Sequence, residues 1–268
     1  MLTASLRAAP GRLSLALLIG LAGCAGRTGP RAGLELGELT LGWRLVPGME
    51  LTYACTTTYT QGQQRVEELS RVEHWSYLVR DLDEGIASLE GRLTAFGAGL
   101  TVDGLAVGAD QLAAGEAEEI ERLSALTVDL ALAMDGRVQI TSGSWADRLP
   151  HRQLGLTLPE GAVSVGDDWP DPTAARPYAD LLPMGLELEI SATSRLEDVV
   201  LRDGLTQARI VTEGYVRPAD TQQTGGVFLE GAAWWDLRSG RLLERTLTLT
   251  LPDTEEAERL TIALRLIE

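Results

Sequence analysis

Apolar and polar residues alternate with a period of two along most of the chain after residue 34. This period is typical of β-strands that bury one face. The segments with the alternation are 39–43, 49–55, 72–79, 86–96, 128–134, 186–192, 208–215, 227–235, 246–251 and 260–266. We therefore predict a mainly β protein of antiparallel meanders, arranged in one or two sheets.

Turn-forming residues separate several of these segments. Asp135-Gly136, Asp203-Gly204 and Ser239-Gly240 each stand between two apolar runs, and residues 81–85 have the same character. Aspartate followed by glycine favours the tight turn of a two-stranded hairpin. The sequence therefore predicts antiparallel hairpins at these positions.

Two stretches interrupt the strand pattern and define the predicted organisation. Residues 110–126 are rich in Ala and Glu, with Asp110 as an N-cap, and predict a short surface helix. Residues 144–184 are rich in proline and form a connector between a first half, 34–143, and a second half, 185–268. Short matches between the halves occur in the same order, which is compatible with a duplication and equally with chance similarity of hairpin turns.

The N-terminus has the pattern of an export signal. Arg7 and Arg12 precede an apolar run from residue 13 to residue 21, which is too short to span a bilayer as a helix. The following Ala22-Gly23-Cys24 resembles the cleavage box of bacterial lipoproteins. The resemblance implies a signal peptide at 1–23, cleavage between Gly23 and Cys24, and a lipid on Cys24 that includes fatty acyl chains such as palmitate. An ordinary signal peptide that contains a cysteine is the alternative.

Residues 24–33 then form a lipidated, flexible tether that holds the folded part near the membrane. Ala25 follows the cysteine, and in the lipoproteins that this signal resembles such a residue favours the outer membrane. The chain has neither Lys nor Asn, which suggests a GC-rich bacterial genome. We expect a cell-envelope protein, anchored in the outer membrane of a double-membraned bacterium. In a host with one membrane the anchor faces outward.

The charge of the chain limits its partners. The 39 acidic residues outnumber the 23 basic ones, and the formal net charge is −16. Such a charge repels nucleic acids and anionic lipid surfaces. We expect the lipid bilayer to be contacted through the anchor, and an unknown envelope protein or small ligand to be the partner of the folded part.

Few residues of this chain are suited to catalysis or metal binding. Cys55 lies in a strand pattern and is expected to be a buried small hydrophobe, or else a reactive or intermolecular thiol. His74 and His151 are the only histidines, are 77 residues apart, and fit no zinc motif. A carboxylate pair for hydrolysis stays open, because only a structure shows such a distance. We predict a protein that is not an enzyme and has no cofactor.

The most distinctive internal motif runs from Leu158-Pro159 through Val163 to Val165-Gly166-Asp167-Asp168-Trp169. It resembles a connector in a family of uncharacterised bacterial lipoproteins, and the resemblance covers residues 45–268. The family implies the localisation and the β-rich fold but no activity. We expect Pro159, Gly166, Asp167 and Trp169 to be structural, with Trp169 in the seam between the halves. Calcium binding by Asp167, Asp168 and Asp171 is the alternative.

Two adjacent tryptophans place one indole on each face of a strand. Trp234, with Phe228 on the same face, is a candidate apolar patch for a lipid, sugar or protein partner. Three functions follow: non-enzymatic binding of a ligand or partner at the membrane surface, a lipid carrier or chaperone with a half-open β-barrel, and, less favoured, a carboxylate hydrolase. In residues 187–191 and 246–250, apolar and polar residues alternate strictly, so only one face of each strand is apolar. A deep cavity would need apolar residues on both faces, and this pattern is evidence against one at these positions.

Overall fold

The computed structural model describes residues 37–61, 67–103, 105–106, 121–122, 127–140, 150–175, 178, 187–219, 226–251 and 258–267. The chain divides into two units, residues 1–32 and 33–268, and every described residue belongs to the second. The predicted signal peptide, the tether and most of the predicted helix at 110–126 lie outside the described residues, although residues 121–122 are helical. None of the described helices has the length and apolar character needed to cross a membrane.

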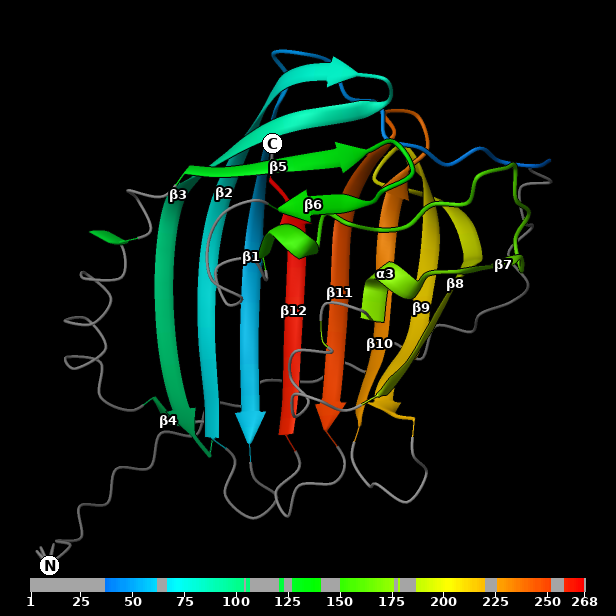
Figure 1. Ribbon diagram of the computed structural model, residues 1–268. Coiled ribbons are helices and arrows are strands. Elements are labelled where there is room, and N and C mark those ends of the chain that lie inside the picture. The colour runs from blue at the N-terminus through cyan, green and yellow to red at the C-terminus, as the bar shows by residue number, and fades with distance from the viewer. Residues whose placement is uncertain are drawn as a thin grey trace, which may run out of the picture. The chain divides into compact units, whose positions relative to one another are not determined.

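Within these residues, the strands form one antiparallel sheet, as Figure 1 shows. The strands are β1 (Glu50–Gln61), β2 (Glu67–Asp83), β3 (Ile86–Val102), β4 (Leu105–Ala106), β5 (Thr127–Ala133), β6 (Val138–Ile140), β7 (Asp168–Pro170), β8 (Leu188–Arg202), β9 (Leu205–Pro218), β10 (Val227–Asp236), β11 (Arg241–Leu251) and β12 (Glu258–Leu266). Their order is β6-β5-β3-β2-β1-β12-β11-β10-β9-β8-β7, with β4 beside β3. The mainly β prediction is confirmed, with a single sheet as the arrangement.

The two halves of the chain form two meanders that meet in the middle of the sheet. β1, the first long strand, pairs with β2 on one side and with the last strand, β12, on the other. The connector supplies β7 and the short helix α3 (Pro172–Ala175). Among the described residues, β6 and β7 end the sheet on its two sides, so the sheet stays open.

The strands are joined differently at the two ends of the sheet. At the end drawn at the top of Figure 1, short turns join β2 to β3, β5 to β6, β8 to β9 and β10 to β11. Glu84-Gly85 and Asp203-Gly204 have positive φ at both residues, as in the turns that match strand twist. The four predicted turns are confirmed. We call this the short-turn end and the opposite end, where the longer connections lie, the loop end.

One face of the sheet is buried and the other faces outward. Alternate residues of β1, such as Leu51, Tyr53 and Cys55, are buried, and the residues between them are partly exposed. In Figure 1, β5, β6 and α3 lie in front of the central strands, so the sheet curls around its buried face. We call this the concave face, and the outward one the convex face.

Residues 37–49 cover part of the concave face without becoming a strand. Their alternation predicts a strand, but the structure contains only an isolated bridge between Leu39 and Val163. The reason is that the backbone hydrogen bonds of these residues are made with different segments. Leu39 pairs with Val163, whereas the Trp43 amide donates a hydrogen bond of 3.3 Å to the carbonyl of Met134. Trp43 is nevertheless buried and packs edge-on against Trp235, with ring centres 4.9 Å apart.

Candidate functional site

Eight neighbouring strands of the sheet lie in the order β3-β2-β1-β12-β11-β10-β9-β8 (Figure 1). Their antiparallel register aligns the residues of the concave face into rows that run across these strands. One row near the loop end contains only aliphatic residues, a glycine and a tyrosine. In strand order it consists of Leu100, Leu69, Tyr59, Leu260, Leu249, Leu229, Gly214 and Ala192. We call it the apolar row.

The next two rows toward the short-turn end include polar side chains, and we call them the polar rows. The nearer row consists of Ala98, Arg71, Thr57, Ile262, Leu247, Gly231, Thr212 and Ser194. The farther row consists of Phe96, Glu73, Cys55, Leu264, Arg245, Ala233, Ile210 and Leu196. The polar side chains of these rows form two groups, one on β1 and β2 and the other on β8, β9 and β11.

On the β2 side, a buried carboxylate holds an arginine. Glu73 is 1% exposed, and its Oε2 accepts a hydrogen bond of 2.9 Å from Trp75 Nε1. Its Oε1 is paired with Nε and Nη2 of Arg71. The guanidinium carbon of Arg71 also lies 5.3 Å from the ring centre of Phe96, a distance at which a cation is attracted to an aromatic face. Two residues therefore fix the direction of Arg71.

On the β8 and β11 side, polar side chains fasten the connector to the sheet. The buried carboxylate of Asp171 accepts a hydrogen bond of 3.0 Å from Ser194 Oγ. Arg245 Nη1 donates to the carbonyl oxygens of Gln153, over 3.2 Å, and of Gly155. Burial lowers the pKa of Arg245, and the nearby Asp171 carboxylate opposes that shift. These contacts tie residues 153–171 to the middle of the concave face.

The connector also covers the concave face on the short-turn side of the polar rows. His151 is fully buried, with its Nδ1 2.7 Å from the Tyr77 hydroxyl and its ring edge-on to Trp75. Gln153 Nε2 donates to the hydroxyl of Tyr178 over 3.1 Å. Burial raises the pKa of Tyr77 well above its ordinary value. This region is therefore a sealed core.

Exposure changes along the apolar row. Leu249 and Leu229 are fully buried, whereas Tyr59, Leu100 and Leu260 are half-buried and Leu69 is 47% exposed. The accessible part of the row therefore lies on β1, β2, β3 and β12. We call the half-buried and exposed residues of this row, Tyr59, Leu69, Leu100 and Leu260, the apolar patch.

Arg71 borders the apolar patch. Its side chain is 25% exposed, whereas that of its partner Glu73 is 2% exposed. The pair thus runs from the sealed core toward the accessible surface, with the cation at the outer end. The site combines an apolar surface with one oriented positive charge.

No motif in the sequence marks this site. Leu69, Arg71 and Glu73 alternate in step with the buried residues of β2, and this period was the available signal. The charged residues at two of these positions conceal the buried face, because charged residues are usually exposed.

The connector motif lies at the edge of the sheet. Trp169 is nearly buried in β7, and its Nε1 donates to the carbonyl of Thr157 over 2.9 Å. Gly166 has a φ of 101°, and the Asp167 carboxylate accepts from the amide of Ser164 over 2.8 Å, so these residues form a turn. Trp169, Pro159 and Asp135 of the β5–β6 turn line a cavity of about 420 Å³. The motif therefore lies between the β7 edge and the β5–β6 turn.

The structure does not bring Trp234 and Phe228 together. Both lie on the convex face of β10, opposite the fully buried Trp235, but six residues of strand, roughly 20 Å, separate them. Trp234 is flanked by the guanidinium groups of Arg202 and Arg209, at 5.3 and 6.0 Å from its ring centre. The two aromatic residues therefore do not form the single apolar patch that the sequence suggested.

The other candidate residues are dispersed. Cys55 is buried, as predicted, and burial, with a smaller contribution from Glu73, raises the pKa of its thiol to about 12. His74 lies on the convex side of β2, whereas His151 is in the core. Asp168 is exposed and Asp171 is buried. In the part of the chain that the structure describes, no three such side chains form a group that could hold a metal ion.

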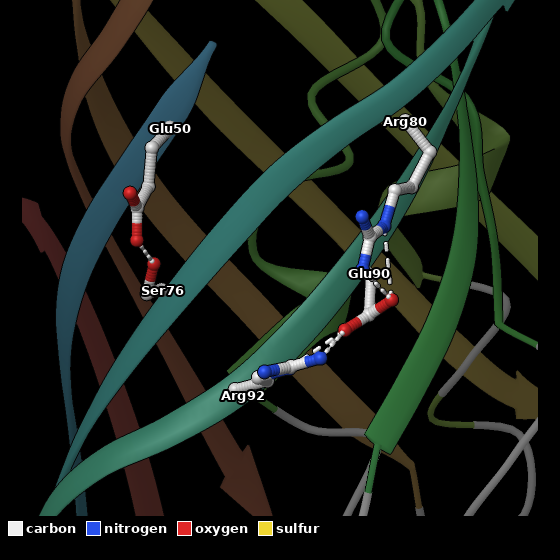
Figure 2. A network of polar contacts seen from close by, with 5 residues as sticks. All are labelled: Glu50, Ser76, Arg80, Glu90 and Arg92. Carbon is white, nitrogen blue, oxygen red and sulfur yellow. Dashed lines mark hydrogen bonds and ion pairs between the residues drawn. The ribbon is translucent and has the colours of Figure 1, made fainter. Parts of the chain in front are cut away.

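The convex face carries hydrogen bonds and ion pairs between surface side chains. Figure 2 shows Glu90 between Arg80 and Arg92, whose Nε atoms donate hydrogen bonds of 2.9 and 2.6 Å to the Glu90 carboxylate. It also shows the Ser76 hydroxyl, which donates a hydrogen bond to the carboxylate of Glu50. Hydrogen bonds from Arg80 and then Arg92 lower the pKa of Glu90. Because these side chains lie at the surface, we assign them to a solvated face.

No protein-family model and no curated protein sequence matches this chain. Among solved structures, the fold is similar to a lipovitellin structure determined for its lipid–protein interactions, with a TM-score of 0.55 and 12% sequence identity. The match covers 84% of this chain and 26% of the lipovitellin chain, so this chain spans about a quarter of that protein. A DUF1329 family protein from Desulfovibrio piger, with 10% identity over 82% of this chain and 86% of its own, has a TM-score of 0.15, too low to support an argument. The lipovitellin match shows the fold alone.

Proposed function

We propose that this chain is a non-enzymatic envelope protein that binds a lipid or similar hydrophobic ligand against the concave face of its sheet. The apolar patch carries this proposal. Its residues lie on the face that forms the core elsewhere, yet Leu69 is 47% exposed and the three other members are only half-buried. Contiguous exposed apolar surface is typical of binding sites.

The dimensions of the patch suit an acyl chain. The patch extends over β3, β2, β1 and β12, and strands spaced about 4.8 Å apart make it roughly 14 Å wide. Leu249 and Leu229 continue the apolar row beyond it on β11 and β10. Those two leucines are buried, so the accessible width is that of the patch, and an apolar chain that lies across its four strands would contact apolar side chains over that width.

Two further observations support a binding role. The fold is similar to that of lipovitellin, a protein studied for its lipid–protein interactions. Among the described carboxylates, Glu90 and Glu189 have clearly shifted pKa values, and both pKa values are lowered. The cause at Glu90 is hydrogen bonding from Arg80 and Arg92, and the cause at Glu189 is hydrogen bonding from Tyr215 and Arg217. A general acid for hydrolysis needs the opposite shift, so neither of these two carboxylates is suited to that role.

The test is native mass spectrometry of the mature protein, purified in detergent from the membranes of an expressing bacterium. We expect a discrete added mass in the lipid range that disappears on denaturation. Leu69→Glu should remove it, because the substitution places a charge in the patch. Ile86→Glu is the matched control, since Ile86 is also 47% exposed but lies on the convex face at the short-turn end. An added mass that survives Leu69→Glu, or is absent from the unaltered protein, contradicts the proposal.

We further propose that Cys24 carries the lipid anchor and that the protein resides in the outer membrane. The support is the sequence of residues 7–25. Growth with labelled palmitate should label the unaltered protein, and Cys24→Ser should give an unlabelled, uncleaved precursor. If Cys24→Ser were cleaved and still held in the membrane, the anchor would be somewhere else. Separation of the two membranes of a double-membraned host then tests the location.

A further inference from the structure

We propose that part of the convex face is a docking surface for a protein segment that carries arginine or lysine side chains. The surface lies on β9 and β10 near the loop end and consists of Glu213, Tyr215, Phe228 and Glu230. We call it the β9–β10 surface. It is on the opposite face of the sheet from the apolar patch, so this inference does not depend on the ligand proposed for the patch.

Two aromatic residues form one part of the β9–β10 surface. Phe228 and Tyr215 are directly opposite each other in the register of β10 and β9, and each stands between two residues of the concave face. Phe228 is 46% exposed. The Tyr215 hydroxyl donates a hydrogen bond of 2.5 Å to Glu189, and the guanidinium carbon of Arg217 lies 4.5 Å from the Tyr215 ring centre. The surface therefore presents an accessible aromatic side chain beside an ordered one, and aromatic residues are enriched in protein interfaces.

Two glutamates form the other part of the surface. Glu230 and Glu213 are directly opposite each other, one row closer to the short-turn end, and both are exposed. Like charges at directly opposed positions destabilise a sheet. Within the described residues, neither carboxylate forms an ion pair with an arginine, since Arg195 of the neighbouring β8 is opposite Val211 in the next row. A cation from a partner would relieve this repulsion.

Opposed acids on another part of the convex face are neutralised within the chain. Glu90 is directly opposite Asp129 across β3 and β5, and both Arg80 and Arg92 form ion pairs with Glu90. The glutamates of the β9–β10 surface lack such arginines in the part of the chain that the structure describes. Positions that break a local rule without compensation are expected at functional sites.

The aromatic and acidic parts together favour a cationic occupant. Strand spacing and the rise of two residues place the four Cα atoms within an area of roughly 5 by 7 Å. An ammonium or guanidinium group there would meet an aromatic ring and two carboxylates, each of which attracts a cation.

The shape and charge of the surface decide which kind of cation fits. Small-molecule sites are concave, whereas these residues lie on the outer face of the sheet, so a protein segment fits better than a free organic cation. A second copy of the chain also has a formal charge of −16 and would be repelled.

The test measures binding of a fluorescein-labelled peptide of alternating arginine and serine to the full-length mature protein in detergent, by fluorescence anisotropy. Exposed ion pairs and cation–π contacts each contribute modestly, so Glu213→Gln with Glu230→Gln should weaken binding about three- to tenfold at low salt. Phe228→Ser should also weaken it. The difference caused by the glutamates should shrink at high salt, which screens exposed charges.

Asp83→Asn with Glu84→Gln is the matched control, because it removes the same number of charges from exposed positions in the β2–β3 turn. It should leave binding unchanged. Equal weakening by the two double variants would mean that the peptide responds to overall charge, and would overturn the inference. Unchanged binding by Glu213→Gln with Glu230→Gln would also overturn it. Light scattering that shows two copies associating through Phe228 would assign the surface to a second copy and contradict a basic partner.

A second readout needs no partner. If the two glutamates repel each other, Glu213→Gln with Glu230→Gln should raise the urea midpoint of the unbound protein at low salt, and less so at high salt. A midpoint no higher than that of the unaltered protein would overturn the argument from charge and with it the inference.

Discussion

The two parts of the concave face are built from the same strands but differ in what covers them. On the short-turn side, the connector and residues 37–49 pack onto the sheet, and Trp75, Trp235 and Tyr77 are fully buried. Near the loop end on β1–β3, the same face carries Leu69 at 47% exposure. The sealed part supplies the stability of the sheet, which leaves the apolar patch available for a ligand. Substitutions in the two parts should therefore have very different consequences.

The largest effect on stability is expected from Gly136→Ala in the β5–β6 turn. Gly136 has a φ of 85°, and a Cβ there would lie 1.6 Å from the carbonyl oxygen of Leu156 in the connector. Backbone strain and this clash together should lower the free energy of unfolding by about 3–5 kcal/mol. Urea denaturation followed by tryptophan fluorescence measures the loss. Gly161→Ala is the control, since a Cβ there meets nothing within 4 Å. Equal losses for both variants would show that the connector does not seal the core.

A pair of leucine truncations compares the two parts directly. Leu132 in β5 is fully buried, so Leu132→Ala should cost about 2–5 kcal/mol of unfolding free energy. Leu69→Ala removes a half-exposed side chain and should cost less than about 1 kcal/mol. The same denaturation experiment reads both. A loss for Leu69→Ala as large as that for Leu132→Ala would mean that Leu69 belongs to the core and not to a binding surface.

A smaller effect is expected where the connector contacts β2 through a hydrogen bond. Tyr77→Phe removes the hydroxyl that lies 2.7 Å from His151 Nδ1 in the core, and should cost about 1–2 kcal/mol. Tyr215→Phe, which removes an exposed hydrogen bond to Glu189 on the convex face, should leave the urea midpoint nearly unchanged. A Tyr77→Phe midpoint equal to that of the unaltered protein would show that this contact does not help to hold the connector.

Local patterns in the sequence predict the strands and turns, but not their order across the sheet. The period of two and the Asp-Gly pairs act over a few residues, and the hairpins at 135–136 and 203–204 follow directly from them. The pairing of β1 with β12 joins residues such as Tyr53 and Leu266, about 200 positions apart, for which no local signal exists. The same limit explains residues 39–43, whose alternation reflects burial against several segments and not pairing with one strand.

Less of the candidate site than of the fold could be predicted from the sequence. A proline-rich composition identifies the connector, but the hydrogen bonds that dock it on the concave face come from distant residues such as Arg245 and Ser194. The adjacent tryptophans led to the prediction of an apolar patch at Trp234. In the structure, Trp234 lies on the convex face beside the guanidinium groups of two arginines. The ion pair of Arg71 and Glu73 lies at positions where the strand period requires burial, and that conflict between charge and period is the signal to look for.

The last prediction concerns Cys55, which lies beside Glu73 at the boundary between the sealed core and the patch. Burial raises the pKa of its thiol from 9.0 to about 12, so the reactive thiolate is scarce in the folded protein at neutral pH. Because the folded pKa is the higher one, the neutral thiol favours folding below about pH 9, and this contribution is lost as the pH rises toward 12. Alkylation by iodoacetamide, read by peptide mapping so that Cys55 is distinguished from Cys24, should be slow in native protein at pH 8 and fast in urea. Rapid native alkylation at pH 8 would place the accessible region at least one row deeper than Arg71, and would require the boundary of the site to be redrawn.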